Sequence, residues 1–78
     1  MILHRNEKEL IRVLFKEGTP LSVHELAELS GMSWVTAKKY LKHIEALSII
    51  VSQKRDKRTK YSINRQLVKR LFERKHED

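Results

Sequence analysis

Residues 21–50 read LSVHELAELSGMSWVTAKKYLKHIEALSII, and this stretch decides the fold. It opens with Ser22 followed three residues later by Glu25, a capping-box pattern that marks the start of a helix. Apolar residues then recur at helical spacing, which predicts a short amphipathic helix over residues 23–30. The apolar side of so short a helix needs a partner, and the rest of the stretch supplies one.

The second part of the stretch predicts another helix directly after a tight turn. Gly31 suits the left-handed position just past a helix end, and Ser33 can cap a helix over residues 33–47. The apolar stripe of this helix has spacings of three and four residues: Ala37, Tyr40, Leu41, Ile44 and Leu47. Two helices joined by so short a turn predict a helix-turn-helix unit.

A further helix is predicted on the N-terminal side, over residues 6–17. Asn6 followed by Glu9 can cap it, and Gly18, Thr19 and Pro20 end it. The apolar residues between these signals recur at helical spacing: Leu10, Ile11, Leu14 and Phe15. The three helices can bury one another around a predicted core of Leu10, Leu14, Leu26, Leu29, Met32, Ala37, Leu41 and Ile44.

On the C-terminal side, the pattern changes to that of strands. β-Branched residues after position 48, a charged break and a second alternating run predict a two-stranded hairpin over residues 49–63. Asn64 can cap a last helix over residues 65–76, with an apolar stripe of Leu67, Val68, Leu71 and Phe72. The order of elements is that of a mainly helical α+β fold.

Two apolar segments have more than one interpretation. The stripe of the last helix either packs on its own domain or pairs with a second copy as a homodimer. The chain also begins with three apolar residues, Met1, Ile2 and Leu3. This segment either extends the first helix, pairs as a strand or contacts a second subunit.

Length and composition exclude several classes of protein. The 78 residues fit a single domain over 1–78 and are too few for the large enzyme architectures. The sequence has no Cys, scattered His and only two Gly, so we expect no metal, no cofactor, no small-molecule ligand and no enzymatic activity. Neither a membrane span nor a signal-peptide pattern is present, and we expect a cytoplasmic protein. The composition also resembles thermophile usage, with 35% charged residues and few Asn and Gln.

The net charge of +7 is unevenly distributed along the chain. Residues 1–37 contain four Lys and Arg and five acids, whereas residues 38–75 contain thirteen Lys and Arg and only three acids. A solubilising surface would explain a small excess of positive charge but not this asymmetry. It indicates a polyanionic partner that contacts the second half of the chain.

The exposed side of the helix over residues 33–47 is the predicted contact surface. An α-helix fits the major groove of double-stranded DNA, with its N-terminal residues toward the base edges. A basic hairpin tip can contact phosphates beside it. The candidate DNA-binding residues are therefore Ser33, Trp34, Val35, Thr36, Lys38, Lys39, Lys42 and His43 on the helix, and Lys54, Arg55, Lys57, Arg58 and Lys60 on the hairpin.

Residues 21–50 also resemble the winged helix-turn-helix transcriptional regulators. The resemblance rests on matches to the family patterns x-x-E-L-A, G-[IVM]-S-x-x-T and L-x-x-L-E, namely Glu25-Leu26-Ala27, Gly31-Met32-Ser33, Thr36, Leu41 and Ile44-Glu45. It implies a three-helix core with the hairpin as a wing, and sequence-specific binding of double-stranded DNA. The chain departs from the family at Ser48, where many members have Gly, and in a wing tip without Gly.

Other functions and contacts are also compatible with the sequence. A winged helix can serve as a protein-interaction module in a transcription or replication assembly, and the charge is compatible with RNA binding. Trp34 either packs on the edge of its helix or contacts DNA, and Tyr40 is better suited to the core or its rim than to a base contact.

Overall fold

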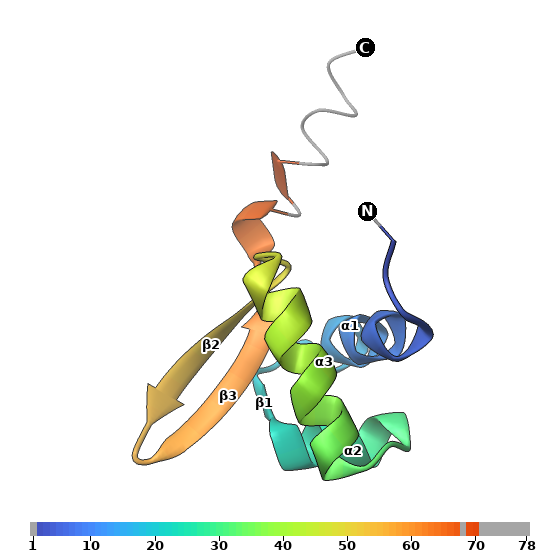
Figure 1. The fold of residues 1–78 in the computed structure, drawn as a ribbon. Coiled ribbons are helices and arrows are strands. Elements are labelled where there is room, and N and C mark those ends of the chain that lie inside the picture. Colours follow the sequence, from blue (N-terminus) through green and yellow to red (C-terminus); the bar gives the residue numbers. More distant parts are fainter. Residues whose placement is uncertain (1, 68, 71–78) are drawn as a thin grey trace.

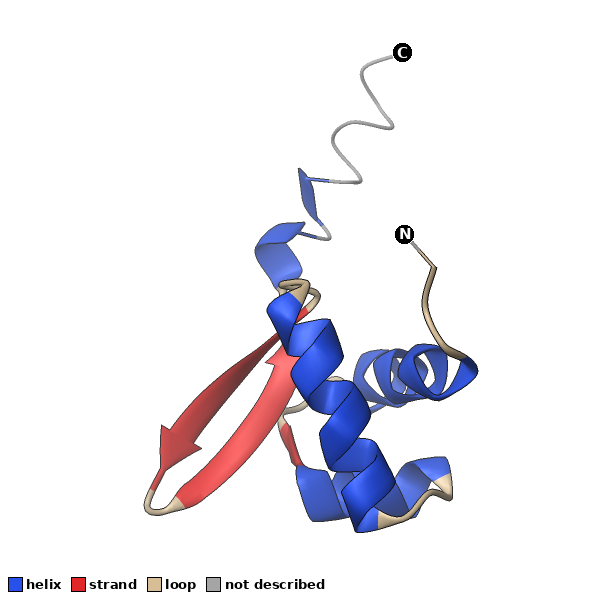
Figure 2. Cartoon of the chain, viewed as in Figure 1, coloured by secondary structure: helices blue, strands red, loops and turns tan. Residues whose placement is uncertain are grey.

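The computed structural model describes residues 2–67, 69 and 70 (Figures 1 and 2). Three helices surround one core, and a long hairpin extends from them (Figure 1). Residues 65–67, 69 and 70 are helical, and the remainder of the predicted last helix, including Val68, Leu71 and Phe72, lies outside the described residues. The elements in chain order are α1 (Arg5–Glu17), β1 (Leu21–Ser22), α2 (Val23–Ser30), α3 (Trp34–Ala46), β2 (Ile50–Arg55) and β3 (Arg58–Ile63).

The start of α1 differs from the prediction. His4, not Asn6, is the N-cap, since its Nδ1 accepts a hydrogen bond from the backbone N–H of Asn6 at 3.1 Å. Glu7 completes the capping box by accepting from the N–H of His4 at 2.8 Å. The predicted cap of Asn6 and Glu9 is wrong because the helix begins earlier, and Glu9 bonds to Arg12 instead.

The helix-turn-helix unit begins and ends at the predicted signals. Ser22 and Glu25 form the capping box of α2, and Gly31 ends the helix with a φ of 70°. At this φ a side chain would be strained, which is why Gly suits the position. Ser33 caps α3 by accepting from the N–H of Thr36 at 3.2 Å. Both ends of the turn are therefore fixed by local hydrogen bonds.

The sheet has three strands rather than the predicted two. β2 and β3 form the expected antiparallel hairpin, and β1 pairs with the other edge of β3, so the strand order is β1-β3-β2. β1 aligns Leu21 with Tyr61 and Ser22 with Lys60. The middle of β3 is thereby connected to the segment that leads into α2.

The chain leaves α3 through a strained residue. Ser48 has a φ of 65°, in the left-handed region that glycine adopts far more readily than serine. The side chain of Asn64 donates to the Ser48 carbonyl at 2.7 Å, and its backbone N–H donates to the Ile49 carbonyl at 2.9 Å. The end of β3 therefore stabilises the exit from α3.

The core lies between the three helices and the base of the sheet. Six of the eight predicted core residues are buried, and Met32 is partly buried against them. Leu29 is 50% exposed, and its assignment to the core is wrong because the short α2 turns that residue away from its neighbours. The prediction missed four buried apolar residues, among them the strand positions that close the core from the sheet: Val13, Leu21, Ala27 and Ile50.

No helix in the described part of the chain is long and apolar enough to span a bilayer.

Candidate nucleic-acid interface

The outer face of α3 carries a stripe of one valine and three lysines. The three lysines follow Val35 after three, four and seven residues, at Lys38, Lys39 and Lys42. At these helical spacings all four residues lie on one side of the helix. All four are exposed. The core residues of α3 are on the opposite side, because the buried positions are Ala37, Leu41 and Ile44. We call these four exposed residues the outer stripe.

Two other predicted DNA-binding residues, Ser33 and Thr36, form hydrogen bonds with each other at the start of α3. The Ser33 hydroxyl donates to Thr36 Oγ1 at 2.9 Å and accepts from the Thr36 N–H at 3.2 Å. Thr36 is half-buried. These two hydroxyls hold the first turn of the helix together, and the surface that α3 presents is made mainly by the outer stripe.

Trp34 is positioned from both sides. Its ring stacks on that of His24 in α2, with 5.8 Å between centroids, and Nζ of Lys38 lies 5.0 Å from its centroid. The ring is 41% exposed, so it packs on its neighbours and still reaches the surface. His24 was not among the predicted site residues, since its place beside Trp34 depends on how α2 and α3 pack.

A different set of contacts links α3 to α1. Nδ1 of His43 contacts Oε2 of Glu7, and the His4 ring stacks on Tyr40 with 4.6 Å between centroids. His43 thus faces α1 with one ring nitrogen, a contact that sequence reasoning did not foresee. Tyr40 is half-buried and packs against the core, as predicted. These contacts fix the angle at which the outer stripe is presented.

Glu7 is a buried acid in this interface, with only 2% of its surface exposed. Burial raises the pKa of its carboxyl, but hydrogen bonds from the His4 backbone and the His43 side chain outweigh burial and lower it. The carboxylate is therefore stabilised in its ionised form between α1 and α3.

The wing ends in a two-residue turn without glycine. Asp56 and Lys57 have φ values of 50° and 67°, and Arg55 pairs directly with Arg58. Positive φ at both central residues is the requirement of a type I′ turn, whose twist matches that of a hairpin. The absence of Gly therefore does not change the turn type that a tight hairpin requires.

The basic residues of the wing lie on both of its faces. Residues paired across the ladder share a face, so Arg55, Arg58 and Lys60 lie on one side. Lys54 lies on the other side, the one on which Ser52 contacts Glu45 of α3. All residues from 51 to 60 are exposed. The wing therefore presents positive charge on both faces beyond the body of the domain.

A cleft of about 630 Å³ separates the start of α3 from the wing. Trp34 and Lys38 line the helix side together with His24, and residues 57–61 line the other. The acid in this lining is Glu25, whose pKa is lowered by hydrogen bonds from Ser22 and by the charges of Lys60 and Arg58. The start of α3 and the wing tip both lie in the lower part of the view in Figure 1. Five of the thirteen predicted residues thus line one basic cleft, namely Trp34, Lys38, Lys57, Arg58 and Lys60.

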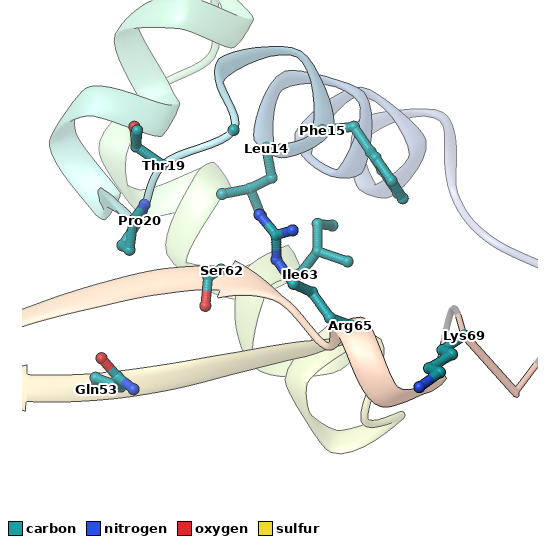
Figure 3. Close-up of a pocket in the computed structure, with 10 residues that line it drawn as sticks. Leu14, Phe15, Thr19, Pro20, Gln53, Ser62, Ile63, Arg65 and Lys69 are labelled. Atoms are coloured by element: carbon teal, nitrogen blue, oxygen red, sulfur yellow. The ribbon is translucent and has the colours of Figure 1, made fainter.

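A second hollow, of about 530 Å³, lies on another side of the sheet (Figure 3). Leu14 and Phe15 enter it from α1, and Gln53 and Ser62 enter it from the wing strands. Its lining is largely apolar and contains no residue of the predicted interface. Among the described residues, no group of three metal-ligating side chains comes together.

No protein-family model and no curated protein sequence matches the chain. Solved structures do match. The homodimeric winged helix-turn-helix DNA-binding domain of Mb0332 from Mycobacterium bovis, a possible ArsR-family transcriptional regulator, is 22% identical with a TM-score of 0.72. The match covers 86% of this chain and 60% of that one, so the chain spans less than two thirds of the length of that domain.

Two other solved structures are similar to the same degree. ST1889 from the thermoacidophilic archaeon Sulfolobus tokodaii is 20% identical, with a TM-score of 0.77, and the match covers 90% of this chain and 70% of that one. NolR from Sinorhizobium fredii is 18% identical, with a TM-score of 0.69 and coverage of 90% and 72%. Together with the order of helices and strands, these matches establish that the chain has the winged helix-turn-helix fold.

Proposed function

We propose that the chain is a transcription regulator that binds double-stranded DNA in a sequence-specific manner. α3 lies in the major groove, and the wing lies along the backbone or in the minor groove. The observation that carries the proposal is the outer stripe, which presents three exposed lysines on the second helix of a helix-turn-helix unit. A helix of this kind is the element that other proteins place in the major groove.

The charge distribution supports the same orientation. Lys38 of the outer stripe lines the basic cleft on one side, and Lys57, Arg58 and Lys60 of the wing line it on the other, so one bound duplex can contact both elements. Phosphate contacts fix the position of a protein on DNA, and base contacts provide the specificity. In this arrangement the wing and Lys42 supply positioning contacts, and the start of α3 faces the base edges. The solved neighbours described as DNA-binding and regulatory domains are consistent with this role.

A homodimer is the second part of the proposal. The Mycobacterium bovis domain with this fold is homodimeric. In this chain Ile2 is exposed next to α1, and Leu67 belongs to the apolar stripe predicted for dimerisation. A two-fold dimer would place two copies of α3 on half-sites about one helical turn apart. Sedimentation equilibrium tests this directly, since a monomer at micromolar concentration would contradict it.

A salt-titrated binding assay tests the proposed function. Duplex DNA from the region upstream of the chain's own gene is compared with random duplex of equal length. Tighter binding to the upstream DNA that persists as salt rises would support a sequence-reading regulator. Equal and steeply salt-dependent binding to both would indicate non-specific DNA coating or other target sites. Absence of binding at moderate salt would instead favour the protein-interaction module.

If the chain binds both duplexes equally, selection from a random duplex library distinguishes a regulator of other sites from a non-specific DNA-binding protein. A regulator of other sites enriches a defined sequence, whereas a non-specific protein enriches none. A single-stranded RNA competitor of equal length separates the RNA-binding alternative. RNA recognition of this kind relies on exposed aromatic side chains, and we expect the duplex to be preferred.

A further inference from the structure

We infer that Val35 reads the methyl group of a thymine in the DNA site and is the residue that selects an A·T pair at that position. The inference deepens the proposed function and rests on it. It concerns which base α3 recognises, whereas the proposed function concerns only that α3 enters the groove.

Val35 is an unusual residue for its position. It is 67% exposed, the highest exposure of any large apolar side chain in the described helices. It is the second residue of α3 and the first of the outer stripe. A helix that enters the major groove directs its N-terminal residues at base edges, so Val35 is the apolar group that meets them first.

The residues around Val35 have other partners. The hydroxyls of Ser33 and Thr36 bond to each other. The Trp34 ring contacts His24 and Lys38, and all three line the cleft. Val35 is therefore the free apolar group at the start of the helix.

The chemistry of α3 leaves few ways to recognise an A·T pair. From residue 33 to residue 46 the sequence contains no Asn, Gln or Arg. An amide side chain that pairs with adenine is thus missing from the helix. A lysine donates to guanine O6 and N7 but also to adenine N7 and thymine O4, so it does not by itself select an A·T pair. The thymine methyl is the group that an A·T pair presents in the major groove and a G·C pair lacks, and an exposed valine can contact it. We therefore expect a thymine close to a guanine in each half-site.

Deoxyuridine provides the test because it differs from thymidine only by this methyl. Sites are first selected from a random duplex library with the full chain. Each thymine of the selected site is then replaced by deoxyuridine, one at a time, and the dissociation constant is measured. One position per half-site is expected to weaken binding about fourfold, the factor that corresponds to one buried methyl-sized group.

The variant Val35→Ala links this effect to the residue. Because Val35 is exposed, the variant keeps its fold, which a melting curve verifies. It is expected to bind the thymine site about fourfold more weakly than the parent for each half-site that the protein occupies, and deoxyuridine should weaken its binding no further. The matched control is Val51→Ala, another exposed valine, on the face of β2 opposite Ser52; it should keep the full deoxyuridine effect.

The outcomes separate the two proposals. A selected site without thymine, or a deoxyuridine effect that is equally large in Val35→Ala, would overturn the role of Val35 while leaving sequence-specific binding intact. A library in which no sequence is enriched would overturn the proposed function itself, and the reading of thymine with it.

Discussion

Glu7 of α1 and His43 of α3, 36 residues apart in the sequence, contact each other across the helix interface. Glu7 also closes the capping box of α1 by accepting from the His4 backbone. One carboxylate therefore both starts α1 and positions α3 against it. Because the outer stripe lies on α3, this contact helps to set the orientation of the surface that we propose meets DNA.

We expect the Glu7 carboxylate to make stability depend on pH in the acid range. Its pKa in the folded chain lies below the ordinary value of 4.5, so the unfolded chain takes up the proton first. The contribution is complete above that ordinary value and disappears as the pH falls through the lower, folded-state pKa. Urea unfolding of Glu7→Gln between pH 6 and 3 should show a flatter dependence than the parent chain.

The same site predicts reduced stability at neutral pH when the carboxylate is removed. Glu7→Ala removes a buried acceptor and should lower the free energy of unfolding by about 2 kcal/mol. The matched control is Glu28→Ala, which removes an exposed carboxyl of α2 and should cost well under half as much. Equal decreases in the two variants would contradict the assigned role of Glu7.

At Ser48 we expect a substitution that increases the free energy of unfolding. Its φ of 65° is costly for any residue with a side chain, whereas glycine adopts it freely. The greater backbone entropy of glycine in the unfolded chain offsets part of the gain. Ser48→Gly should therefore raise the free energy of unfolding by about 0.5–1 kcal/mol. Ser48→Ala keeps the strain and should give no gain, and a comparable increase in both variants would argue against strain at this position.

Lys38 and Lys39 are expected to determine discrimination between DNA sequences. Replacing both by Ala should remove most of the preference for a selected site over random duplex, with residual binding to both, because the wing charges remain. Competition titration against random duplex measures the ratio of affinities. Lys8→Ala with Lys16→Ala in α1 removes the same charge from exposed positions elsewhere and should leave this ratio unchanged. An unchanged ratio in the Lys38 and Lys39 variant would mean that these two lysines do not read bases.

The wing is expected to contribute affinity without specificity. Neutralising Arg55, Lys57 and Arg58 should weaken binding to all sequences alike. The slope of log K against log salt should become less steep by about 0.9 for each DNA phosphate that the wing no longer neutralises. A triple variant of exposed α1 cations with the same charge change, Arg5→Ala, Lys8→Ala and Lys16→Ala, is the control. An unaltered slope in the wing variant would remove the wing from the interface.

The sequence predicts the helix-turn-helix unit well because its boundaries are local. Ser22, Gly31 and Ser33 act through hydrogen bonds and backbone angles within a few residues of themselves. Their effect is therefore visible in the sequence. The exposed lysines of α3 are predictable for the same reason, since the apolar stripe of a helix defines its opposite face.

The features that the sequence does not reveal depend on packing between distant segments. β1 has only two residues, Leu21 and Ser22, and it is a strand because Tyr61 and Lys60 lie beside it. No alternation can be seen in so short a segment. The cap at His4 was missed because histidine is not among the usual N-cap residues, although the acid three residues later was a usable signal.

Lys57 does not favour the left-handed backbone that the type I′ geometry of the wing turn demands of it. Asn-Gly, the sequence that suits such turns best, would remove a cation from the outermost point of the wing. The tip of the wing thus retains a positive charge and accepts backbone strain at Lys57. If position 57 is randomised, selection for thermal stability alone should enrich glycine at this position. Selection for DNA binding should instead keep a basic residue.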